Sequence, residues 1–388
     1  MSTADLFAPL DLGKLKLSHR VVLAPLTRCR AFDGVPQPAM VEYYKQRATE
    51  GGLLITEATA VSPVASGYPR VPGIYTDEQV EGWKKVVDAV HSEGAIIFCQ
   101  LWHAGRASHR AHQPEGGETV SSTNTPISEK WKALLPDGTE EAYSVPRALD
   151  TAEVPWIIKE FQGAAINSVR AGFDGIEVHG AHGYLVDQFL KETINDRSDM
   201  YGGSVENRLR LLMDILQGVV QVFGTERVGV RISPVSEYND AAVPDPLNLG
   251  LSIIKAINEF QTKMGSRMCY LHVTRPRFLL ITAGEEPLRQ QEELKLMRAW
   301  REAYRGSFMS SGGYTRDLGT RALADGDADL IAYGRLFISN PDLVLRFRVN
   351  ARLNAYDRDT FYTGDPVVGY TDYPFLGDDL GNVFLELK

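Results

Sequence analysis

Eight short apolar runs alternate with longer amphipathic runs along this chain, and no other feature constrains the fold as strongly. Each short run is apolar on both parities, as expected for a strand that is covered on both faces. Several of the longer runs begin at Asp, Ser or Pro and end at Gly, as helices prefer. The strand-like runs span residues 21–24, 53–58, 95–101, 175–180, 227–233, 270–274, 307–311 and 328–334. The helical runs span residues 38–49, 77–94, 155–172, 204–224, 249–260 and 292–304.

Eight strand–helix units in series predict an α/β fold, a (β/α)8 TIM barrel, whose usual length of ~250 residues can grow past about 400 with insertions. A doubly wound sheet is the alternative, but it would carry its Gly-rich turn after the first strand. Here the first strand leads into PLTRCR, and the Gly-rich turn SSGGYTRD follows the seventh strand. We expect residues 1–388 to form a single domain, with residues 115–153 as a long excursion after the third strand and residues 350–388 as a tail packed on the barrel.

Charge and cysteine content limit the partners of the chain. A net charge of −9 argues against nucleic acid or an anionic membrane as the main partner. The three cysteines, Cys29, Cys99 and Cys269, are widely spaced and odd in number, which fits a reducing compartment. No apolar run reaches the ~20 residues of a membrane span, and the N-terminal residues lack the apolar run of a secretory signal. We therefore expect a cytoplasmic protein with a small-molecule ligand.

Glycines and an arginine follow the last two predicted strands. In a TIM barrel, chemistry takes place at the carboxyl ends of the strands, and the loops after strands seven and eight often hold a phosphate. Gly312 and Gly313 follow the seventh strand, and Gly334 and Arg335 follow the eighth. Backbone N–H groups and a bidentate arginine would bind the phosphate there. The alternative is that the glycines only turn the chain.

Three other polar residues stand at predicted strand ends. Arg231, at the end of the fifth strand, is a cation that needs an anionic or delocalised ligand, or else a structural ion pair. Gln100, in the third strand, offers a donor and an acceptor to a heterocyclic edge. Thr27, just past the first strand, either donates a hydroxyl hydrogen bond or serves as a turn residue.

The fourth predicted strand ends in HGAHGY, which contains His179, His182 and Tyr184. A zincin site needs H-E-x-x-H on a helix and a third ligand, neither of which is present, so we expect no metal. Two imidazoles at the barrel mouth suit hydrogen bonding to a substrate oxygen that gains negative charge. A phenol holds its proton at neutral pH and can deliver it as a general acid. Aromatic packing is the alternative for Tyr184.

These motifs occur in the same order in the old yellow enzyme family, which the chain resembles nearly from end to end. The matching segments are APLTR, FCQLWHAGR, HGAHGYL, RISP, SSGGYTR, AYGRLFISNPDL and DTFYTGDPVVGYTDYPFL. The sequence looks most similar to the plant 12-oxophytodienoate reductases. The resemblance implies a barrel that binds FMN, accepts a hydride from NADPH, and then reduces the C=C bond of an α,β-unsaturated carbonyl compound. Reductant and enone would alternate at one site.

The resemblance assigns most of these residues to the cofactor. The flavin ring would be lined by Pro25, Leu26, Thr27, Ala58 and Gln100. Arg231 would stand at the N1 and O2 edge of the ring and stabilise the negative charge of reduced flavin. The FMN phosphate would be held by Gly313, Gly334 and Arg335.

The remaining matches concern the substrate. The resemblance implies that His179 and His182 bind the carbonyl oxygen, while hydride from flavin N5 goes to the β-carbon and a proton from Tyr184 goes to the α-carbon. Arg277, after the sixth strand, matches a substrate-contact arginine of the plant group. The substrate would be a cyclopentenone oxylipin or another enone, and the protein a monomer or weak homodimer.

Two tyrosines bear on the choice of substrate. Tyr68 and Tyr238 match positions that narrow the pocket mouth, where the isoform that makes the natural jasmonate precursor carries Phe and His. Tyrosine at both positions resembles the other subgroup, which has a tighter mouth and a different stereoisomer preference. Pocket shape alone discriminates by only ~1–3 kcal/mol.

The sequence departs from the plant group at two places. The stretch between Tyr238 and Arg277 is a few residues longer than expected. Cys29 stands where a non-thiol residue is expected, either as a reactive thiol or as an inert packed one.

Two functions other than an ene-reductase are possible for such a barrel. A sugar-phosphate aldolase or isomerase would need a Schiff-base lysine or a glutamate base, and Glu57 is the acid that stands at a strand end. A barrel that binds FMN without turnover is the second alternative function.

Overall fold

The computed structural model describes residues 5–276 and 286–378, and within them eight parallel strands close into a barrel. The sheet closes because β11 pairs with β6 on one side and with β12 on the other. The predicted TIM barrel is therefore confirmed, and each of its eight strands overlaps a predicted run. The barrel strands are β3 (Val21–Leu23), β4 (Leu53–Ile55), β6 (Ile96–Trp102), β11 (Gly175–Gly180), β12 (Val228–Ile232), β13 (Tyr270–Thr274), β14 (Phe308–Ser311) and β15 (Leu330–Tyr333).

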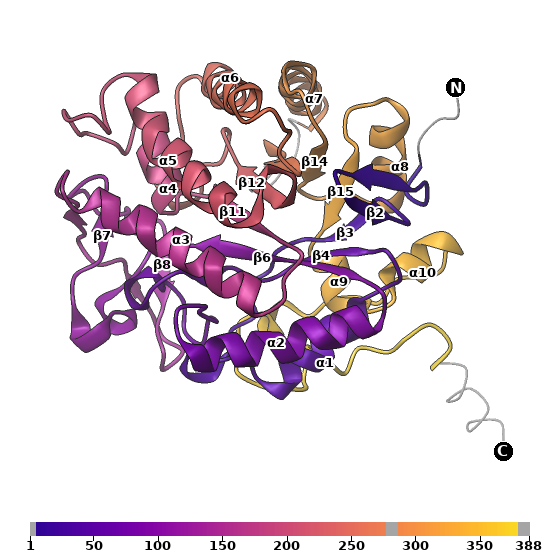
Figure 1. The fold of residues 1–388 in the computed structure, drawn as a ribbon. Coiled ribbons are helices and arrows are strands. Elements are labelled where there is room, and N and C mark those ends of the chain that lie inside the picture. The colour runs from indigo at the N-terminus through magenta and orange to yellow at the C-terminus, as the bar shows by residue number, and fades with distance from the viewer. Residues whose placement is uncertain (1–4, 277–285, 379–388) are drawn as a thin grey trace.

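Helices surround the barrel, as Figure 1 shows. The predicted helical runs correspond to α1 (Pro38–Arg47), α2 (Asp77–Ser92), α3 (Val154–Arg170), α5 (Val205–Phe223), α6 (Pro246–Met264) and α7 (Glu286–Ala303). The α2 helix starts with a capping box between Thr76 and Gln79, and α6 ends at Gly265 in the left-handed conformation. Four shorter helices complete the fold, namely α4 (Leu185–Leu190), α8 (Arg316–Ala324), α9 (Arg335–Ser339) and α10 (Leu343–Arg348). No described helix has the length and apolarity to cross a bilayer.

A hairpin of β1 (Leu10–Leu12) and β2 (Leu15–Leu17) closes the amino end of the barrel. Leu12 and Leu17 are buried in one apolar cluster with barrel-lining side chains such as Phe98. The hairpin was not predicted, because its charged residues Asp11 and Lys16 leave runs of only three residues. Its packing leaves the opposite, carboxyl end as the open end of the barrel.

The chain leaves the barrel at residue 103, after β6, and returns at α3, so the excursion starts earlier than the predicted residue 115. It contains the short strands β7 (Val120–Ser121), β8 (Lys132–Leu134), β9 (Glu140–Ala142) and β10 (Arg147–Ala148). In Figure 1, β7 and β8 lie at the carboxyl end of β6, away from the hairpin that contains β2. Ser128 and Trp131 of the excursion both donate to the carboxylate of Asp240.

Residues 350–378 run over the barrel with little regular structure and are fixed by buried arginines. Arg30 donates to the carbonyls of Thr360, Phe361, Asp365 and Val368. Arg28, Arg47 and Arg346 likewise donate to the carbonyls of Gly369, Tyr370 and Pro374, respectively. Buried guanidinium groups need every donor occupied, and the irregular backbone of the tail supplies those acceptors. Because Arg28 and Arg30 follow the predicted flavin loop directly, the tail is attached beside that loop.

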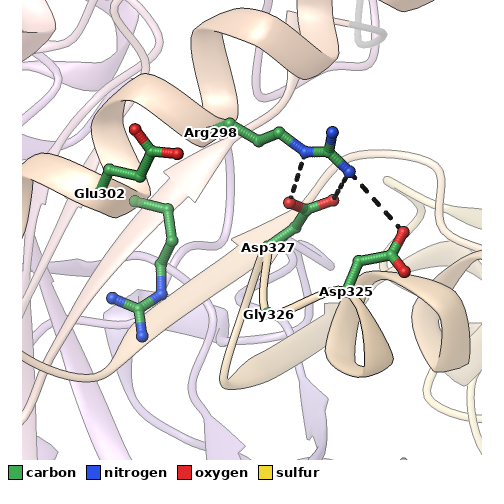
Figure 2. Close-up of a pocket in the computed structure, with 6 residues that line it drawn as sticks. Arg298, Glu302, Asp325, Gly326 and Asp327 are labelled. Atoms are coloured by element: carbon green, nitrogen blue, oxygen red, sulfur yellow. Dashed lines mark hydrogen bonds and ion pairs between the residues drawn. The ribbon is translucent and has the colours of Figure 1, made fainter.

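Surface clefts at the amino end of the barrel are not a candidate site. Figure 2 shows one of them, where Arg298 forms ion pairs with Asp327 at 2.7 Å and with Asp325 at 3.7 Å. Asp325 and Asp327 precede β15, and most residues lining the second cleft also lie just before barrel strands. Charge pairs at this end of such barrels serve stability rather than chemistry. A functional site is therefore expected at the opposite, carboxyl end of the barrel.

Candidate functional site

Polar side chains from neighbouring strands gather inside the carboxyl half of the barrel. The strand register places His179 of β11 opposite Arg231 of β12, and Arg231 opposite His272 of β13. One layer below, Glu177 pairs with Gln100 of β6. Because side chains alternate along a strand, Glu177 and His179 face the same side. The barrel interior is thus apolar at its amino end and polar at its carboxyl end.

A chain of buried hydrogen bonds forms the floor of this polar layer. Gln100 donates its amide to Glu177 over 2.7 Å, and Nδ1 of His272 lies 2.8 Å from the other oxygen of Glu177. The second ring nitrogen of His272 lies 2.8 Å from the hydroxyl of Ser311. Burial by itself would raise the pKa of Glu177, but His272, Arg231 and the hydrogen bonds hold that pKa below its ordinary value. We infer that Glu177 is ionised.

Arg231 is a buried cation whose donors are not all used by the protein. Its side chain is 8% exposed, and its Nε has no hydrogen-bond partner among the described residues. Glu177 lies close enough to favour the charged form, although burial lowers the pKa of Arg231. A buried guanidinium donor without an acceptor is costly, so this position is suited to an acceptor or anion supplied by a ligand.

His179 and His182 approach each other at right angles at the top of β11. Their ring centroids are 5.5 Å apart with an interplanar angle of 81°. The N–H of Ala181 donates to Nδ1 of His179 over 3.3 Å, so the neutral ring carries its proton on Nε2. Burial first, and then Arg231, lowers the pKa of both rings well below the ordinary value. Both histidines are therefore neutral, and a neutral imidazole carries one N–H.

The turn after His179 is held in an unusual backbone conformation. His182 has φ of +59°, a left-handed conformation that is uncommon for a residue with a side chain. Ser233 accepts its backbone N–H at 2.7 Å, and Asn239 donates to its carbonyl at 3.0 Å. Backbone strain of this kind persists where the surroundings enforce it, often at functional sites. The segment after β12 therefore holds the backbone of His182 in this conformation.

Tyr184 lies beside the two histidines at the N-terminal cap of α4. Its ring meets those of His179 and Trp102 edge to face, at centroid distances of 5.0 Å and 5.3 Å. The residue is 9% exposed. Burial, and secondarily the neighbouring Tyr238 and Tyr143, raises its pKa well above the ordinary value. Tyr184 therefore holds its proton at neutral pH.

Aromatic residues from four segments form the mouth of the site. The hydroxyls of Tyr68 and Tyr238 are 2.8 Å apart. Tyr362 of the tail stacks on Tyr68 at 5.9 Å, and Trp131 of the excursion meets Tyr238 at 4.8 Å. The sequence patterns singled out Tyr68 and Tyr238 but missed the other two, because neither the tail nor the excursion carries a local signal of which barrel end it covers.

The predicted phosphate residues lie at the ends of β14 and β15. Gly312 and Gly313 have φ of +111° and +78°, which favour glycine. A Cβ atom on Gly334, at the start of α9, would lie 3.0 Å from the side chain of Leu26. Arg335 is exposed and donates to the hydroxyl of Tyr356 at 3.4 Å. Beside Gly312 stands Arg275, a cation that the sequence patterns did not single out.

The remaining predicted site residues differ in how far they are exposed. Pro25 and Ala58 are buried, whereas Leu26 and Thr27 are partly exposed at the end of β3. Arg277 lies outside the described residues. Within the described ranges, no cluster of histidine, cysteine and acidic side chains is arranged to hold a metal ion.

Cys29 and Glu57 are buried parts of the framework. Burial, followed by the charge of Glu57, raises the pKa of Cys29 to about 12, which makes it an inert packed thiol. Glu57 accepts the backbone N–H of Arg28 at 3.2 Å and packs against Tyr44, whose hydroxyl accepts the N–H of Glu57 at 2.8 Å. Burial raises the pKa of Glu57 to about 7. A carboxyl group placed in this way supports the loop after β3.

The chain matches one protein family over most of its length. The model of the NADH:flavin oxidoreductase / NADH oxidase family matches residues 5–354. Two proteins of rice, Oryza sativa subsp. japonica, are similar throughout. 12-Oxophytodienoate reductase 7 is 57% identical over 376 residues, which cover 96% of this chain and 95% of the relative. 12-Oxophytodienoate reductase 1 is 50% identical over 371 residues, which cover 96% and 93%.

Solved structures of morphinone reductase share the fold. One superposes with a TM-score of 0.88 at 41% identity and covers 98% of this chain and 99% of that protein. A complex of morphinone reductase with tetrahydroNAD gives a TM-score of 0.87 at 41% identity, with coverage of 97% and 99%. An identity of 41% over nearly the whole chain makes this a likeness of sequence as well as of fold.

Proposed function

The chain belongs to the NADH:flavin oxidoreductase / NADH oxidase family, the old yellow enzyme family that its motifs resemble, and on this premise we propose that it is an NADPH-dependent ene-reductase. It would reduce the C=C bond of α,β-unsaturated carbonyl compounds. The proposal includes tight, non-covalent binding of FMN, action in the cytoplasm, and a monomer or weak homodimer as the working form.

The residues at the carboxyl end fit the FMN that the family implies. The vacant donor of Arg231 is suited to the electron-rich edge of a flavin ring, and the backbone of Gly312 and Gly313 is open to a phosphate. Gln100, Thr27 and Ala58 would line the ring. Gly334 and Arg335 would complete the phosphate site. When bound, FMN supplies the hydride chemistry, which no side chain can provide.

His179 and His182 would hold the carbonyl oxygen of the enone. Both rings are neutral, and the tautomer of His179 presents its Nε2–H. Two N–H donors aimed at one oxygen draw electron density away from the β-carbon and stabilise the negative charge that develops on that oxygen. Neutral imidazoles suit this task, because they stabilise the charge without passing a proton to the oxygen first.

Tyr184 would deliver the proton to the α-carbon. Its raised pKa keeps the phenol protonated until a strongly basic carbon forms next to it. Its ring contact with His179 at 5.0 Å puts the hydroxyl-bearing side chain beside the group that holds the substrate oxygen. The convergence of three neutral proton-bearing groups, His179, His182 and Tyr184, beside Arg231 is the observation that carries the proposal.

The names of the rice relatives favour a cyclopentenone oxylipin such as 12-oxophytodienoate as substrate. Tyr68 and Tyr238 close the mouth through a hydrogen bond, which favours a tight pocket and thus the stereoisomer preference of the Tyr/Tyr subgroup. Another small electrophilic enone would fit the same chemistry. A panel that contains both cis stereoisomers of 12-oxophytodienoate and simple enones separates these substrates by turnover.

An aldolase or isomerase is less well supported. Glu57 is hydrogen-bonded to the backbone of Arg28. Lys191 donates to the carbonyls of Ser233 and Pro234 at 3.1 Å and 2.8 Å, so its ammonium group is already engaged. Both side chains are buried, Glu57 at 1% and Lys191 at 0% exposed, so neither is placed to meet a substrate as a base or a Schiff-base amine.

The absorption spectrum of the purified protein tests the proposal. We expect a yellow protein that releases FMN on denaturation, is bleached by NADPH without oxygen, and recovers its colour when 2-cyclohexenone is added. A colourless protein that cannot be reconstituted with FMN would refute flavin chemistry. A flavin that is reduced but never reoxidised by enones would support the alternative of a binding protein without turnover.

A further inference from the structure

Asp240, in the loop after β12, holds the excursion against the mouth of the site. One oxygen of its carboxylate accepts the backbone N–H of Ser128. The other oxygen accepts the hydroxyl of Ser128 and the indole N–H of Trp131, both over 3.0 Å. A carboxylate only accepts hydrogen bonds, and it binds donors more strongly than a neutral acceptor does. Asp240 is therefore the point at which the loop after β12 and the excursion are joined.

The indole that Asp240 holds packs on the pair of tyrosines at the mouth. The ring of Trp131 meets that of Tyr238 at a centroid distance of 4.8 Å and an angle of 78°. The hydroxyl of Tyr238 in turn lies 2.8 Å from that of Tyr68. All three side chains are partly buried and pack against one apolar cluster, which includes Tyr184. Without its anchor, the indole would no longer keep the Tyr238 ring turned toward Tyr68.

The loop around Asp240 divides its contacts among consecutive residues. Asn239 and Asp240 have φ of +60° and +58°, a conformation that Asn and Asp adopt more readily than other residues with side chains. Asn239 donates to the carbonyl of His182 at 3.0 Å, and a Cβ atom on Gly183 would lie 2.7 Å from the Cβ of Asn239. Tyr238 thus forms the mouth, Asn239 supports the turn of His182, and Asp240 binds the excursion. A change at Asp240 acts on the mouth first.

We propose, on the basis of the ene-reductase function proposed above, that Asp240 is a positioning residue for substrate specificity, which keeps the mouth narrow by holding Trp131 against Tyr238. Discrimination by the shape of a pocket amounts to roughly 10- to 200-fold, and it requires walls that do not yield. The favoured enone is the one whose ring substituents pass the closed pair of Tyr68 and Tyr238. A stereoisomer with its substituents on the other face of the ring needs the pair to open.

Trypsin digestion of the FMN-bound protein tests the contact itself, without any enone. Lys130 and Lys132 are exposed and stand on either side of Trp131. Asp240→Asn keeps the size and the tolerance of positive φ, but its NH2 group cannot accept a hydrogen bond. Trp131→Phe removes the indole donor and keeps an aromatic ring. We expect cleavage after these lysines to be about fivefold faster or more in both variants, because local opening exposes the backbone. Unchanged cleavage would overturn the proposal.

Turnover of the two cis stereoisomers of 12-oxophytodienoate tests the consequence for specificity. The two have the same bonds, so the ratio of their kcat/KM values reports fit alone. In Asp240→Asn and Trp131→Phe we expect this ratio to fall about fivefold or more toward one, through a lower KM of the disfavoured stereoisomer. A general structural defect would lower both kcat/KM values and leave the ratio as it was. That result, or a ratio near one in the unmodified protein, would overturn the proposal.

Asp245→Asn is the matched control, with the same substitution in the same loop. Asp245 caps α6 by accepting from Asn248, and asparagine is an equally good capping residue. Both cleavage and the stereoisomer ratio should equal those of the unmodified protein. Equal changes in Asp245→Asn and Asp240→Asn would overturn a specific role of Asp240. An unmodified protein that reduces no enone would refute the proposed function instead, and trypsin cleavage alone would then decide whether Asp240 holds the excursion.

Discussion

Removing Arg30 should release the C-terminal tail from the barrel. Arg30 is 1% exposed and donates hydrogen bonds of 2.6 to 3.3 Å to five backbone carbonyls and to the hydroxyl of Thr363. Four of the carbonyls belong to residues 360–368 of the tail. A single arginine therefore connects the segment that follows β3 to the segment that carries Tyr362.

The expected loss of stability is set by detachment of the tail. Hydrogen bonds to charged groups contribute about 1.5–3 kcal/mol each, and a simple sum over the bonds of Arg30 would be comparable to the whole ~5–15 kcal/mol stability of a domain. The tail instead detaches locally, and water then satisfies its carbonyls. We expect Arg30→Ala to lower the free energy of unfolding by about 3 kcal/mol, a large value for a single substitution. Arg30→Lys offers fewer donors in a different geometry, so it should also lower the free energy of unfolding by a substantial part of this amount.

Urea unfolding followed by circular dichroism measures this loss, and limited proteolysis detects the released tail. Arg321→Ala on α8 is the control, because the Arg321 side chain is exposed and makes no ion pair or hydrogen bond with the described residues. Its effect should stay within about 0.5 kcal/mol. If Arg30→Ala is as stable as Arg321→Ala and its tail is equally resistant to protease, the hydrogen bonds of Arg30 are not what holds the tail on the barrel.

Three other perturbations separate buried charges from buried neutral groups. Glu177→Gln should destabilise the protein by about 3 kcal/mol, because it leaves Arg231 as a buried cation without its counter-charge; an unchanged urea midpoint would contradict an ionised Glu177. The pKa of Glu57 rises from 4.5 to about 7 in the folded protein, so the native state binds more protons and stability should fall by about 3 kcal/mol as pH rises from 4.5 to 7. Glu57→Gln should remove that part of the pH dependence, and a parallel pH–stability curve would refute the assignment. Cys29 should resist thiol reagents at pH 8 in the folded protein and react after unfolding, because its pKa is raised to about 12; fast labelling of the native protein at Cys29 would count against its burial.

The barrel and part of its site could be predicted because their signals are local. Strands covered on both faces are apolar on both parities, so a run such as residues 175–180 identifies itself. The order of strands then places His179 and Arg231 at one end of the barrel without further information. The glycines after β14 are required by positive φ angles, which a sequence pattern can also suggest.

Other parts of the site depend on contacts between distant residues. Glu177 and His272 stand in different strands, and their hydrogen bond spans 95 positions of the sequence. A polar residue inside an apolar strand was the available signal for both, but it does not indicate the partner. Tyr362 and Trp131 come from irregular segments, where no periodicity shows which residues face the site. Short helices such as α9 have too few turns to produce a helical pattern.

The proton donation by Tyr184 is the central claim, and the two half-reactions of the Tyr184→Phe variant test it most directly. The variant keeps the ring that packs against Trp102 and His179, so FMN binding and flavin reduction by NADPH should change by no more than about twofold. Reoxidation by 2-cyclohexenone should slow by about 100-fold or more, the usual contribution of a positioned general acid. Equal slowing of both half-reactions, or an unchanged reoxidation rate, would contradict the account.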